Sequence, residues 1–337
     1  MTLIATIATP LFVMQAGDRL LTRTNKDDSV EIFDANSNKS IIYEASDGLL
    51  SISYCGKAFF DNIPTDEWIA RALHPGVKKM FDDSPTPYAI SLTQLDHNSI
   101  LSTGSLIKLL QEKFDKIPES EVQEHGVSVT ICGWKFKRSR VIPVLIELRR
   151  LKGSKNTKPD GYKRKPGMHK NSVHSLIGTG SHDMVWKYFD DAWDAIHRGA
   201  SDMQYSGTNS YLDSVRYALA STIQHAAKID PTVGKNVHIA TFRKPTWPNT
   251  HVETHFFGTE PHPATIYLPS PTGQERKISV PDAAVTGWVL TPFGSCAPSY
   301  LVGRYSLHGA FSHIDMVGAN SQNNVHAFFQ TIRRRRV

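Results

Sequence analysis

The residues most able to do chemistry stand at the start of the chain, where Thr2 follows Met1 directly. A threonine hydroxyl is a poor nucleophile unless a nearby base accepts its proton, and a chain that begins with threonine carries a base in its own α-amino group. The pKa of such an amine is about 7.7–8.0, close to a working pH. Because threonine is small, we expect the initiator methionine to be removed. Many chains begin Met-Thr, so further support has to come from the residues that follow.

The segment from Leu3 to Ala16 predicts how a carboxylate could be placed beside Thr2. Its residues are mostly β-branched, aromatic or small, and Pro10 breaks the run near its middle, which favours two short strands joined as a hairpin. A hairpin of this length returns Asp18, at the end of the sequence Ala-Gly-Asp, to the side of Thr2. The spacing therefore predicts a nucleophile and an acidic side chain at one end of a sheet.

At this point the sequence resembles the proteasome β-subunits and their bacterial relative, the peptidase of the ATP-dependent heat-shock protease. In these families a leading threonine is followed by a strand pair, an Ala-Gly-Asp or Ala-Ala-Asp motif, and a threonine four residues past the aspartate. Thr2, Ala16-Gly17-Asp18 and Thr22 match this pattern without a gap. The resemblance covers roughly residues 2–242 and implies a threonine-type amide hydrolase, with Thr22 next to the bound substrate.

The resemblance also assigns roles to a lysine and a glycine. The family has a lysine in the strand that follows and a glycine-containing turn before the first helix, and Lys39 and Gly56 occupy these places after a loop slightly longer than usual. Lys39 would favour the alkoxide of Thr2 electrostatically, and Asp18 would hold Lys39. The backbone N–H of Gly56 would donate to the developing oxyanion.

Two later motifs complete the set that the resemblance implies. A Gly-Ser-Gly motif before the third helix corresponds to Gly178-Thr179-Gly180, where Thr179 keeps a hydroxyl that can bond to the free amine. An aspartate followed by Ser-Gly after the fourth helix corresponds to Asp230. Val233 stands where the family has a serine, which puts the orientation of the amine in doubt, and Thr232 could substitute for that serine.

Each of these residues also has an ordinary structural interpretation. Thr2 could simply begin a strand, Asp18 could be a turn residue capped by Arg19, and Lys39 could be a solvated lysine at a strand edge. Cys55 could be a nucleophile, but no motif places a histidine near it, and a small buried side chain is the better interpretation. Taken jointly, the residues are less easily explained in this way than each residue alone.

The hydrophobic pattern predicts an α+β fold. Two strands are expected within 3–16, and one each at 38–43, 49–54, 127–136, 141–148 and 237–242. The first four of these strands, up to residue 54, are expected to form one meander. Helices are expected from residue 64, at 105–114, at 183–197 and at 211–229. This order indicates a four-layer αββα sandwich, the architecture of N-terminal-nucleophile (Ntn) hydrolases, over residues 2–242. We further expect an exposed basic insertion at about 153–170 and a β-rich C-terminal extension over 243–337, with strands at 265–268, 288–290 and 325–329.

Composition limits the classes of function. Three cysteines, none in C-x-x-C spacing, support neither a disulfide framework nor a cysteine zinc site, and a cytoplasmic location fits them. The N-terminal segment has no basic start and is interrupted by polar residues, so we expect no secretion signal and no membrane association. Much of the net charge of +6 lies in residues 152–170 and in Arg333 to Arg336, where solvated basic segments are a better interpretation than nucleic-acid binding.

A histidine-containing segment, His251-Val252-Glu253-Thr254-His255, superficially resembles a zinc motif. Its glutamate is placed differently from that of H-E-x-x-H, and the Pro and Gly residues that flank it argue against a helix. We therefore expect no metal and no cofactor.

The sequence hypothesis is a threonine-nucleophile amide hydrolase, in the first instance a peptidase acting on a peptide or amide substrate as a homo-oligomer, with any ATPase partner unknown. The catalytic set is Thr2, Asp18, Lys39, Gly56, Thr179 and Asp230. The open alternatives are an inactive scaffold with the same fold and a small-molecule amidase or acylase with the same mechanism.

Overall fold

The structure is a computed structural model that describes most of residues 2–257 and short segments beyond them. The described residues are 2–24, 29–34, 39–61, 63–77, 90–91, 95, 99–122, 126–137, 140–154, 157–161, 173–178, 185–191, 194, 209–245, 249–257, 264–268, 276–280, 284–285, 288–291, 294–296, 300–301 and 305–308.

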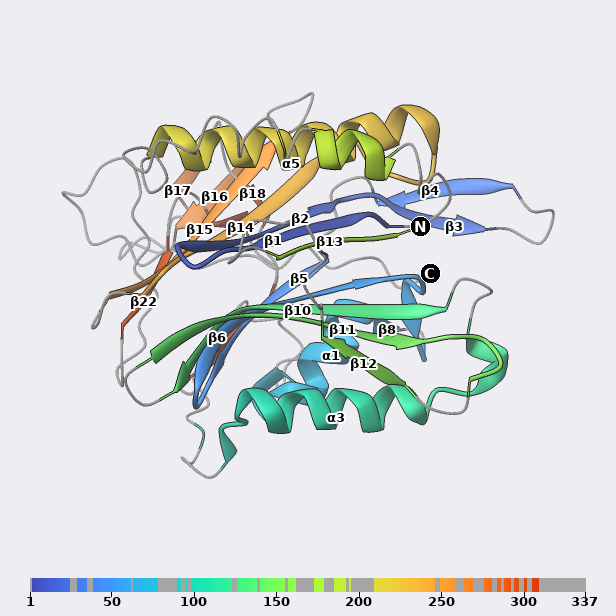
Figure 1. The fold of residues 1–337 in the computed structure, drawn as a ribbon, viewed down its shortest axis with the longest axis horizontal. Helices are drawn as coiled ribbons and strands as arrows, with labels where there is room; N and C mark the ends of the chain where they lie inside the picture. The colour runs from blue at the N-terminus through green and yellow to red at the C-terminus, as the bar shows by residue number, and fades with distance from the viewer. Residues whose placement is uncertain are drawn as a thin grey trace.

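Two large sheets face each other in a mixed α/β fold that contains several antiparallel sheets (Figure 1). The six-stranded sheet has the order β13 (Val173–Ile177), β1 (Ile4–Ala8), β2 (Phe12–Asp18), β14 (Val237–Arg243), β15 (Asn249–Phe257) and β22 (Tyr305–His308). The eight-stranded sheet has the order β12 (Lys158–Gly161), β11 (Arg140–Arg150), β10 (Val127–Lys137), β6 (Gly48–Cys55), β5 (Ser40–Ala45), β19 (Trp288–Thr291), β20 (Gly294–Cys296) and β9 (Ile90–Ser91).

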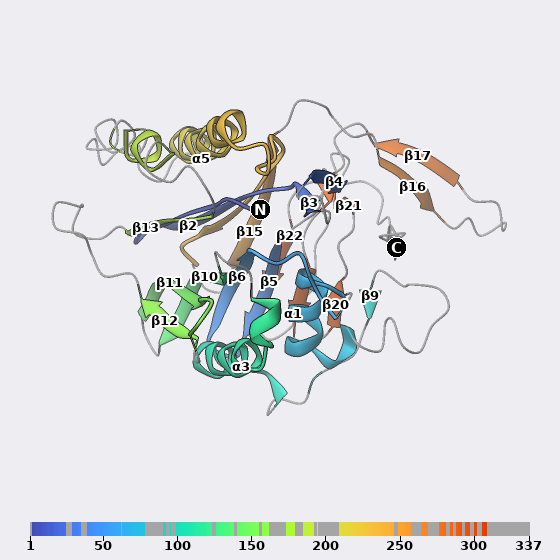
Figure 2. The same cartoon turned by 90° about the vertical axis from the view of Figure 1, so that its right-hand side faces the viewer.

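Four two-stranded ribbons accompany the large sheets. They are β3 (Leu21–Thr24) with β4 (Val30–Asp34), β7 (Phe59–Phe60) with β8 (Ile63–Pro64), β16 (Ala264–Leu268) with β17 (Arg276–Val280), and β18 (Ala284–Val285) with β21 (Tyr300–Leu301). The β16–β17 ribbon extends to one side of the large sheets (Figure 2).

The first hairpin forms because its turn is stabilised locally and its strands are apolar on both faces. Thr9 Oγ1 accepts hydrogen bonds from the backbone N–H groups of Leu11 and Phe12, at 3.2 and 3.0 Å, around Pro10. All residues of β1 and nearly all of β2 are buried, as expected of central strands that are covered on both sides. The predicted hairpin is therefore confirmed, with Asp18 at its end.

Helices cover the outer faces of both sheets. Among them are α1 (Thr65–Leu73), α3 (Thr103–Asp115) and α5 (Asn209–Ile229), and a short 3₁₀ helix lies at Glu119–Glu121. Helix α5 lies over the six-stranded sheet, and α1 and α3 lie on the other side of the molecule, against the eight-stranded sheet (Figure 1). The buried side chains Leu212, Val215, Leu219, Ile223 and Ala226 recur every three or four residues along α5, which gives the helix one apolar face for the sheet.

The space between the two sheets holds a few buried polar contacts within an apolar layer. Gln15 Oε1 accepts hydrogen bonds from Ser51 Oγ and Ser53 Oγ, at 2.7 and 2.6 Å, so a residue of β2 is bonded to two residues of β6. Trp134 Nε1 donates to the carbonyl oxygen of Phe242 at 3.2 Å, from β10 to β14. Because buried polar groups cost free energy when unpaired, these bonds favour one alignment of the two packed sheets over others.

Most predicted elements up to residue 243 are confirmed, but their assembly differs from the prediction. The single four-stranded meander is wrong: β1 and β2 belong to the six-stranded sheet, whereas β5 and β6 belong to the eight-stranded one. The physical reason is that β1 and β2 need partners on both edges, and they find them in β13 and β14. Of the predicted helix at 183–197, residues 185–191 and 194 are described and helical.

Residues beyond 243 contribute strands to both large sheets. β15 pairs with β14, and β19 pairs with β5 in the only parallel pairing among the described strands. The division at residue 242 stays a prediction, as does the insertion at 153–170, of which residues 158–161 form β12. The predicted strand at 325–329 and the basic residues Arg333 to Arg336 lie outside the described residues.

The described helices include none that is long and apolar enough to cross a membrane.

Candidate functional site

A buried ion pair joins the end of the first hairpin to the beginning of β5. Lys39 Nζ lies 3.0 Å from each carboxylate oxygen of Asp18 and donates to the carbonyl oxygen of Leu20 at 2.6 Å. The side chains of Lys39 and Asp18 are only 1% and 0% exposed. An ion pair so fully removed from water is tolerated only when its remaining hydrogen-bonding positions are filled.

Backbone N–H groups fill the remaining positions on Asp18. Leu3 N donates to Oδ1 at 2.8 Å, and Leu20 N and Gly234 N donate to Oδ2 at 3.1 and 3.0 Å. A carboxylate has about four lone-pair positions, so these donors and Lys39 account for its capacity. The carboxylate is therefore held in one orientation, and one of its anchors is the residue directly after Thr2.

Thr2 itself is enclosed by the same residues and by the end of β13. It is 3% exposed, and the next residue, Leu3, is bonded to Asp18 twice: Leu3 N donates to the side-chain oxygen Oδ1, and Asp18 N donates to the carbonyl oxygen of Leu3 at 3.1 Å. On the other side, a Cβ atom at Gly178 would lie 2.5 Å from the carbonyl oxygen of Thr2, and φ of Gly178 is +155°. Gly178 therefore allows β13 to approach Thr2 more closely than any other residue could.

Gly56 lies at a small cavity between the two sheets. The cavity has a volume of about 340 Å³, with Cys55, Gly56 and Ser128 on the side of the eight-stranded sheet and Ile177 and Gly178 on the side of the six-stranded sheet. Because Gly178 packs against Thr2, the cavity lies close to the candidate nucleophile.

Cys55 is suited to a structural role. Its side chain is packed with Ile4 and Ile177 where the two sheets meet. Burial, followed by the negative charge of Glu147, raises the pKa of the Cys55 thiol to about 12. A thiol that stays protonated at neutral pH is a weak nucleophile, which agrees with the sequence interpretation of Cys55 as a small buried side chain.

The motif after α5 reaches the ion pair through its backbone. Asp230 Oδ1 accepts from Thr232 N at 2.8 Å and from Thr232 Oγ1 at 2.5 Å, so the aspartate closes its own turn. Val233, at the place where a serine was expected, packs in the apolar cluster below α5. Gly234 then supplies the N–H that donates to Asp18. Thr179 lies outside the described residues, and its role stays a prediction.

Thr22, the predicted substrate contact, lies on β3 and is partly exposed. It stands two residues beyond Leu20, whose carbonyl oxygen accepts Lys39. Thr22 is thus close in sequence to a residue that contacts the ion pair, and its own contact with substrate stays a prediction.

Several residues of this cluster were missed by sequence reasoning. Leu20 acts through backbone atoms, which carry no residue-type signal. Gly234 ended the motif that begins at Asp230 but was given no role, although a Cβ atom there would lie 2.6 Å from Cβ of Leu20. His238 was also missed: its Nδ1 lies 3.0 Å from Oγ of Ser40, the residue after Lys39, while its neighbour Val237 pairs with Asp18. Burial, with the positive charges of Arg19 and His255, lowers the pKa of His238 to about 3, so the ring is neutral at physiological pH.

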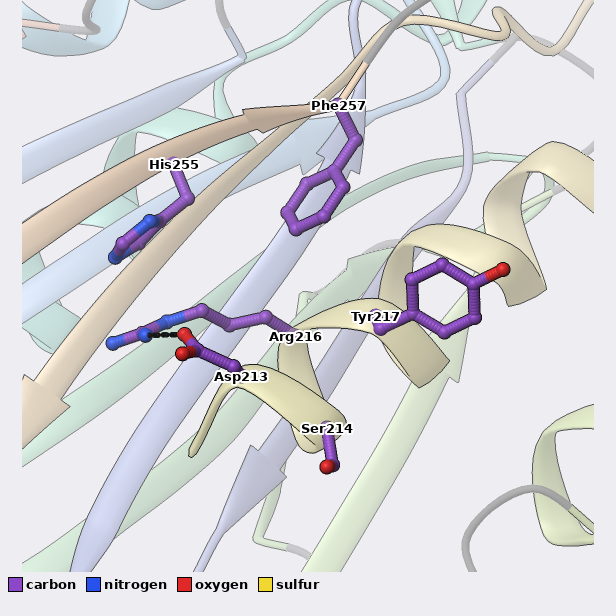
Figure 3. A pocket seen from close by; sticks show the side chains of 6 residues that line it. All are labelled: Asp213, Ser214, Arg216, Tyr217, His255 and Phe257. Atoms are coloured by element: carbon purple, nitrogen blue, oxygen red, sulfur yellow. Dashed lines mark hydrogen bonds and ion pairs between the residues drawn. The ribbon is translucent and has the colours of Figure 1, made fainter. Parts of the chain in front are cut away.

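A larger hollow lies on the outer face of the six-stranded sheet, the face covered by α5 (Figure 3). It has a volume of about 730 Å³ and is bordered by Asp213, Arg216 and Tyr217 of α5 and by His255 and Phe257 of β15. Arg216 donates to Asp213 and to Glu253, each at 2.6 Å. The hollow is therefore bordered by a side-chain ion network that joins helix to sheet.

The segment that resembles a zinc motif is part of β15, so the prediction that it is not a helix is confirmed. Its glutamate, Glu253, also accepts from Arg243 at 3.0 Å. Within the described part of the chain, no group of three or more His, Cys, Asp or Glu side chains is arranged to hold a metal ion.

Comparisons with known proteins give only distant similarities. No family model and no curated protein matches the chain. Among solved structures, the chain is similar to Anbu (ancestral beta-subunit) from Yersinia bercovieri, at 14% identity over 72% of this chain and 81% of that one, with a TM-score of 0.41. Anbu from Hyphomicrobium sp. strain MC1 is 10% identical over 82% and 88%, with a TM-score of 0.41. The structure described as the helical assembly of the Anbu complex from Pseudomonas aeruginosa is 9% identical over 71% and 81%, with a TM-score of 0.36.

These findings correct the family resemblance stated from the sequence. The assignment to the proteasome β-subunits, close to the heat-shock protease peptidase, is wrong: no family model matches, and the solved structures reported are ancestral beta-subunits at low scores. A short motif such as Ala-Gly-Asp can arise from the requirements of one strand end or turn. It therefore does not identify a family over a whole chain. At these scores the similarity supports no statement about activity.

Proposed function

We propose that this chain is a threonine-nucleophile amide hydrolase in which Thr2, freed by removal of Met1, attacks the substrate. The observation that carries the proposal is the buried Asp18–Lys39 pair, whose carboxylate is bonded to the N–H of Leu3, next to Thr2. Burying a lysine and an aspartate costs several kcal/mol per ion before pairing. A cost of this kind is expected where a positive charge is needed beside a reacting hydroxyl.

The proposed reaction uses the α-amino group of Thr2 as its base. The amine takes the proton of the Thr2 hydroxyl while Oγ bonds to the carbonyl carbon of the amide, and Lys39 stabilises the developing negative charge on Oγ. The backbone N–H of Gly56 donates to the oxyanion. The proton then passes to the leaving nitrogen as the C–N bond breaks, which leaves an ester on Thr2. Water, deprotonated by the same amine, hydrolyses this ester and restores the hydroxyl.

The remaining predicted residues have supporting roles in this proposal. Thr179 would orient the α-amino group by a hydrogen bond, and Asp230 would hold the turn that presents Gly234 to Asp18. Thr22 would contact the substrate. The fold would be the four-layer αββα sandwich expected from the sequence, with the site at the edge between its two sheets, and the working form would be a homo-oligomer in the cytoplasm.

One observation favours the inactive scaffold as a second candidate. Val233 replaces the serine expected near the amine, and its side chain is packed in the core, where it cannot orient the amine. An inactive protein with the same fold could keep the Asp18–Lys39 pair as a purely structural contact.

Covalent labelling separates these two candidates. A threonine-directed β-lactone or epoxyketone probe should add its mass once per chain, on a protein whose intact mass shows that Met1 has been removed, and peptide mapping should find the label on Thr2. The label should vanish in Thr2→Ala and persist in Ser214→Ala, which removes an exposed hydroxyl from α5. A folded protein that keeps Met1, or that is labelled elsewhere, would support the scaffold.

A further inference from the structure

Ser128, near the start of β10, has a hydroxyl to which the proposed reaction gives no role. It lines the same cavity as Gly56 and Gly178, and it is only 5% exposed. Ser128 lies directly opposite Cys55 in the pairing of β10 with β6. Cys55 packs with residues of the six-stranded sheet, and side chains that are opposite each other in an antiparallel pair share one face. The Ser128 hydroxyl therefore points into the space between the two sheets.

The side chain of Thr2 is directed to the same space. Leu3 packs in the cluster below α5, whereas Ile4 packs with Cys55 between the sheets. Side chains of an extended chain alternate between its two faces, so Thr2, one residue before Leu3, is turned to the side of Ile4. The backbone of Thr2 also adjoins the cavity wall, because its carbonyl oxygen lies against Gly178.

The turn at Gly56 packs tightly against the residues that lead into Ser128. A Cβ atom at Gly56 would lie 2.5 Å from the carbonyl oxygen of Gly126 and 3.2 Å from Cα of Val127, and φ of Gly56 is +100°. Only glycine fits this contact. The backbone N–H that is the proposed oxyanion donor and the Ser128 hydroxyl thus come from adjoining segments, at one end of the β6–β10 pair and on the wall of one cavity.

The contact of Ser128 with Cys55 leaves the hydroxyl hydrogen available. The two side chains are hydrogen-bonded, and burial raises the pKa of the Cys55 thiol to about 12, so the thiol keeps its proton at neutral pH. The thiol can supply the hydrogen of this bond, and a serine oxygen has two lone pairs with which to accept it. Ser128 can then donate its own hydrogen to another group in the cavity.

We propose that the Ser128 hydroxyl is a second donor to the oxyanion, beside the backbone N–H of Gly56. The inference rests on the proposed function, in which Thr2 is the nucleophile. When Oγ of Thr2 bonds to the carbonyl carbon, the π electron pair of the C=O bond moves to the oxygen, which then accepts from both donors. The pair returns to re-form C=O as the C–N bond breaks, and Ser128 keeps its proton throughout. Oxyanion sites for acyl transfer combine backbone N–H groups with side-chain donors such as serine.

A serine that only held Cys55 in place would affect stability and not the chemical step. An oxyanion donor makes its bond only once Thr2 has begun to attack, so its removal slows the covalent step and leaves the preceding binding of a probe unchanged. The two roles therefore separate in the kinetics of covalent labelling, where the affinity of the reversible complex and the limiting rate constant are measured independently.

A peptide β-lactone tests the second donor, since its acylation of Thr2 passes through an oxyanion. Ser128→Ala should lower the limiting rate constant of labelling about 100-fold and leave the affinity of the reversible complex unchanged. Cys55→Ala is the matched control, because it breaks the same Ser128–Cys55 bond but keeps the Ser128 hydroxyl, and it should be labelled at the wild-type rate. Ser128→Thr and Ser128→Val, which are nearly equal in size and differ in a hydroxyl, should also differ about 100-fold.

The outcomes distinguish this inference from the proposed function. Wild-type rates in Ser128→Ala, or a Cys55→Ala protein slowed as much as Ser128→Ala, would overturn the second donor and leave the nucleophile standing. Equally slow labelling of the Ser128→Thr and Ser128→Val proteins would overturn it as well, since packing and not the hydroxyl would then set the rate. A wild-type protein that is not labelled at all would overturn both, because the oxyanion forms only after attack by Thr2.

Discussion

Among the described residues, two ion pairs have both side chains buried, and they are built in different ways. Lys39 and Asp18 lie between the sheets and fill their remaining bonds with main-chain atoms of Leu3, Leu20 and Gly234. Arg216 and Glu253, 4% and 5% exposed, lie between α5 and the six-stranded sheet, at the hollow of Figure 3. Their further bonds go to other side chains.

This difference separates a candidate site from a structural contact. The side-chain network around Arg216 joins α5 to β14 and β15, because its bonds run from one element to another. The main-chain network around Asp18 instead fixes the backbone of Leu3, the residue directly after Thr2, the proposed nucleophile. A buried ion pair by itself is therefore weak support for a site, and the groups that complete its hydrogen bonds carry the information.

The largest expected effect on stability and labelling comes from replacing the positively charged residue of each ion pair. Lys39→Met should lower the free energy of unfolding by about 3 kcal/mol, since it leaves a buried carboxylate without its counter-ion, and Arg216→Met should cost about the same. Labelling of Thr2 should fall at least about 100-fold in Lys39→Met only. Urea unfolding and labelling rates measure the two quantities. If Arg216→Met slowed labelling as much as Lys39→Met, the distinction between the two pairs would be lost.

A methyl group at Gly178 should disturb the backbone around Thr2 and Asp18, with a smaller loss of stability than Lys39→Met. Gly178→Ala places its Cβ against the carbonyl oxygen of Thr2, so we expect a loss of about 2 kcal/mol in unfolding free energy and slower labelling. The control is Gly153→Ala, where φ is +79° but no atom lies within 4 Å of the added Cβ. It should cost about 1 kcal/mol from backbone strain alone and leave labelling unchanged. Thermal melting compares the stabilities, and equal effects on labelling would argue against close packing at Thr2.

The pH dependence of stability tests His238, which lies between the two regions beside Ser40, Arg19 and His255. Its pKa is lowered to about 3 in the folded protein, so between pH 6.5 and 3 the unfolded chain binds a proton that the folded chain does not. This contribution to stability is fully present above pH 6.5 and is lost as the pH falls, by at most about 1.4 kcal/mol per pH unit. His238→Gln should flatten the slope measured by urea unfolding at pH 7, 6 and 5. An unchanged slope would mean that His238 is not buried in its neutral form.

The smallest effect on stability is expected at the exposed end of the ion-pair network around Arg216. The side chain of Asp213 is 66% exposed, so Asp213→Asn should change the free energy of unfolding by less than about 1 kcal/mol although its bond to Arg216 is only 2.6 Å long. Glu253→Gln, which changes a buried partner of the same arginine, should cost several times more. Denaturant midpoints compare the two variants, and a large effect of Asp213→Asn would mean that the rim is shielded from water.

The sequence by itself determined the local elements and half of the proposed site. Pro10 and the run of β-type residues were sufficient for the first hairpin, and the spacing of Val215, Leu219 and Ile223 was sufficient for α5, because turns and amphipathic faces follow from neighbouring residues. The spacing singled out Asp18, and the resemblance added Lys39, which the structure brings into contact with it.

Only the tertiary structure decided how these parts combine. Strand partners depend on which edges remain unpaired after distant segments have packed, so the separation of β1–β2 from β5–β6 and the parallel pairing of β19 with β5 had no local signal. The contact of Leu20 with the ion pair is made by backbone atoms, which every residue type carries alike, and the need for glycine at 234 arises only because Leu20, distant in sequence, lies 2.6 Å from where a Cβ atom would be. The cavity beside Gly56 has lining residues from both large sheets, such as Ser128 and Ile177, so no local sequence pattern could have indicated it.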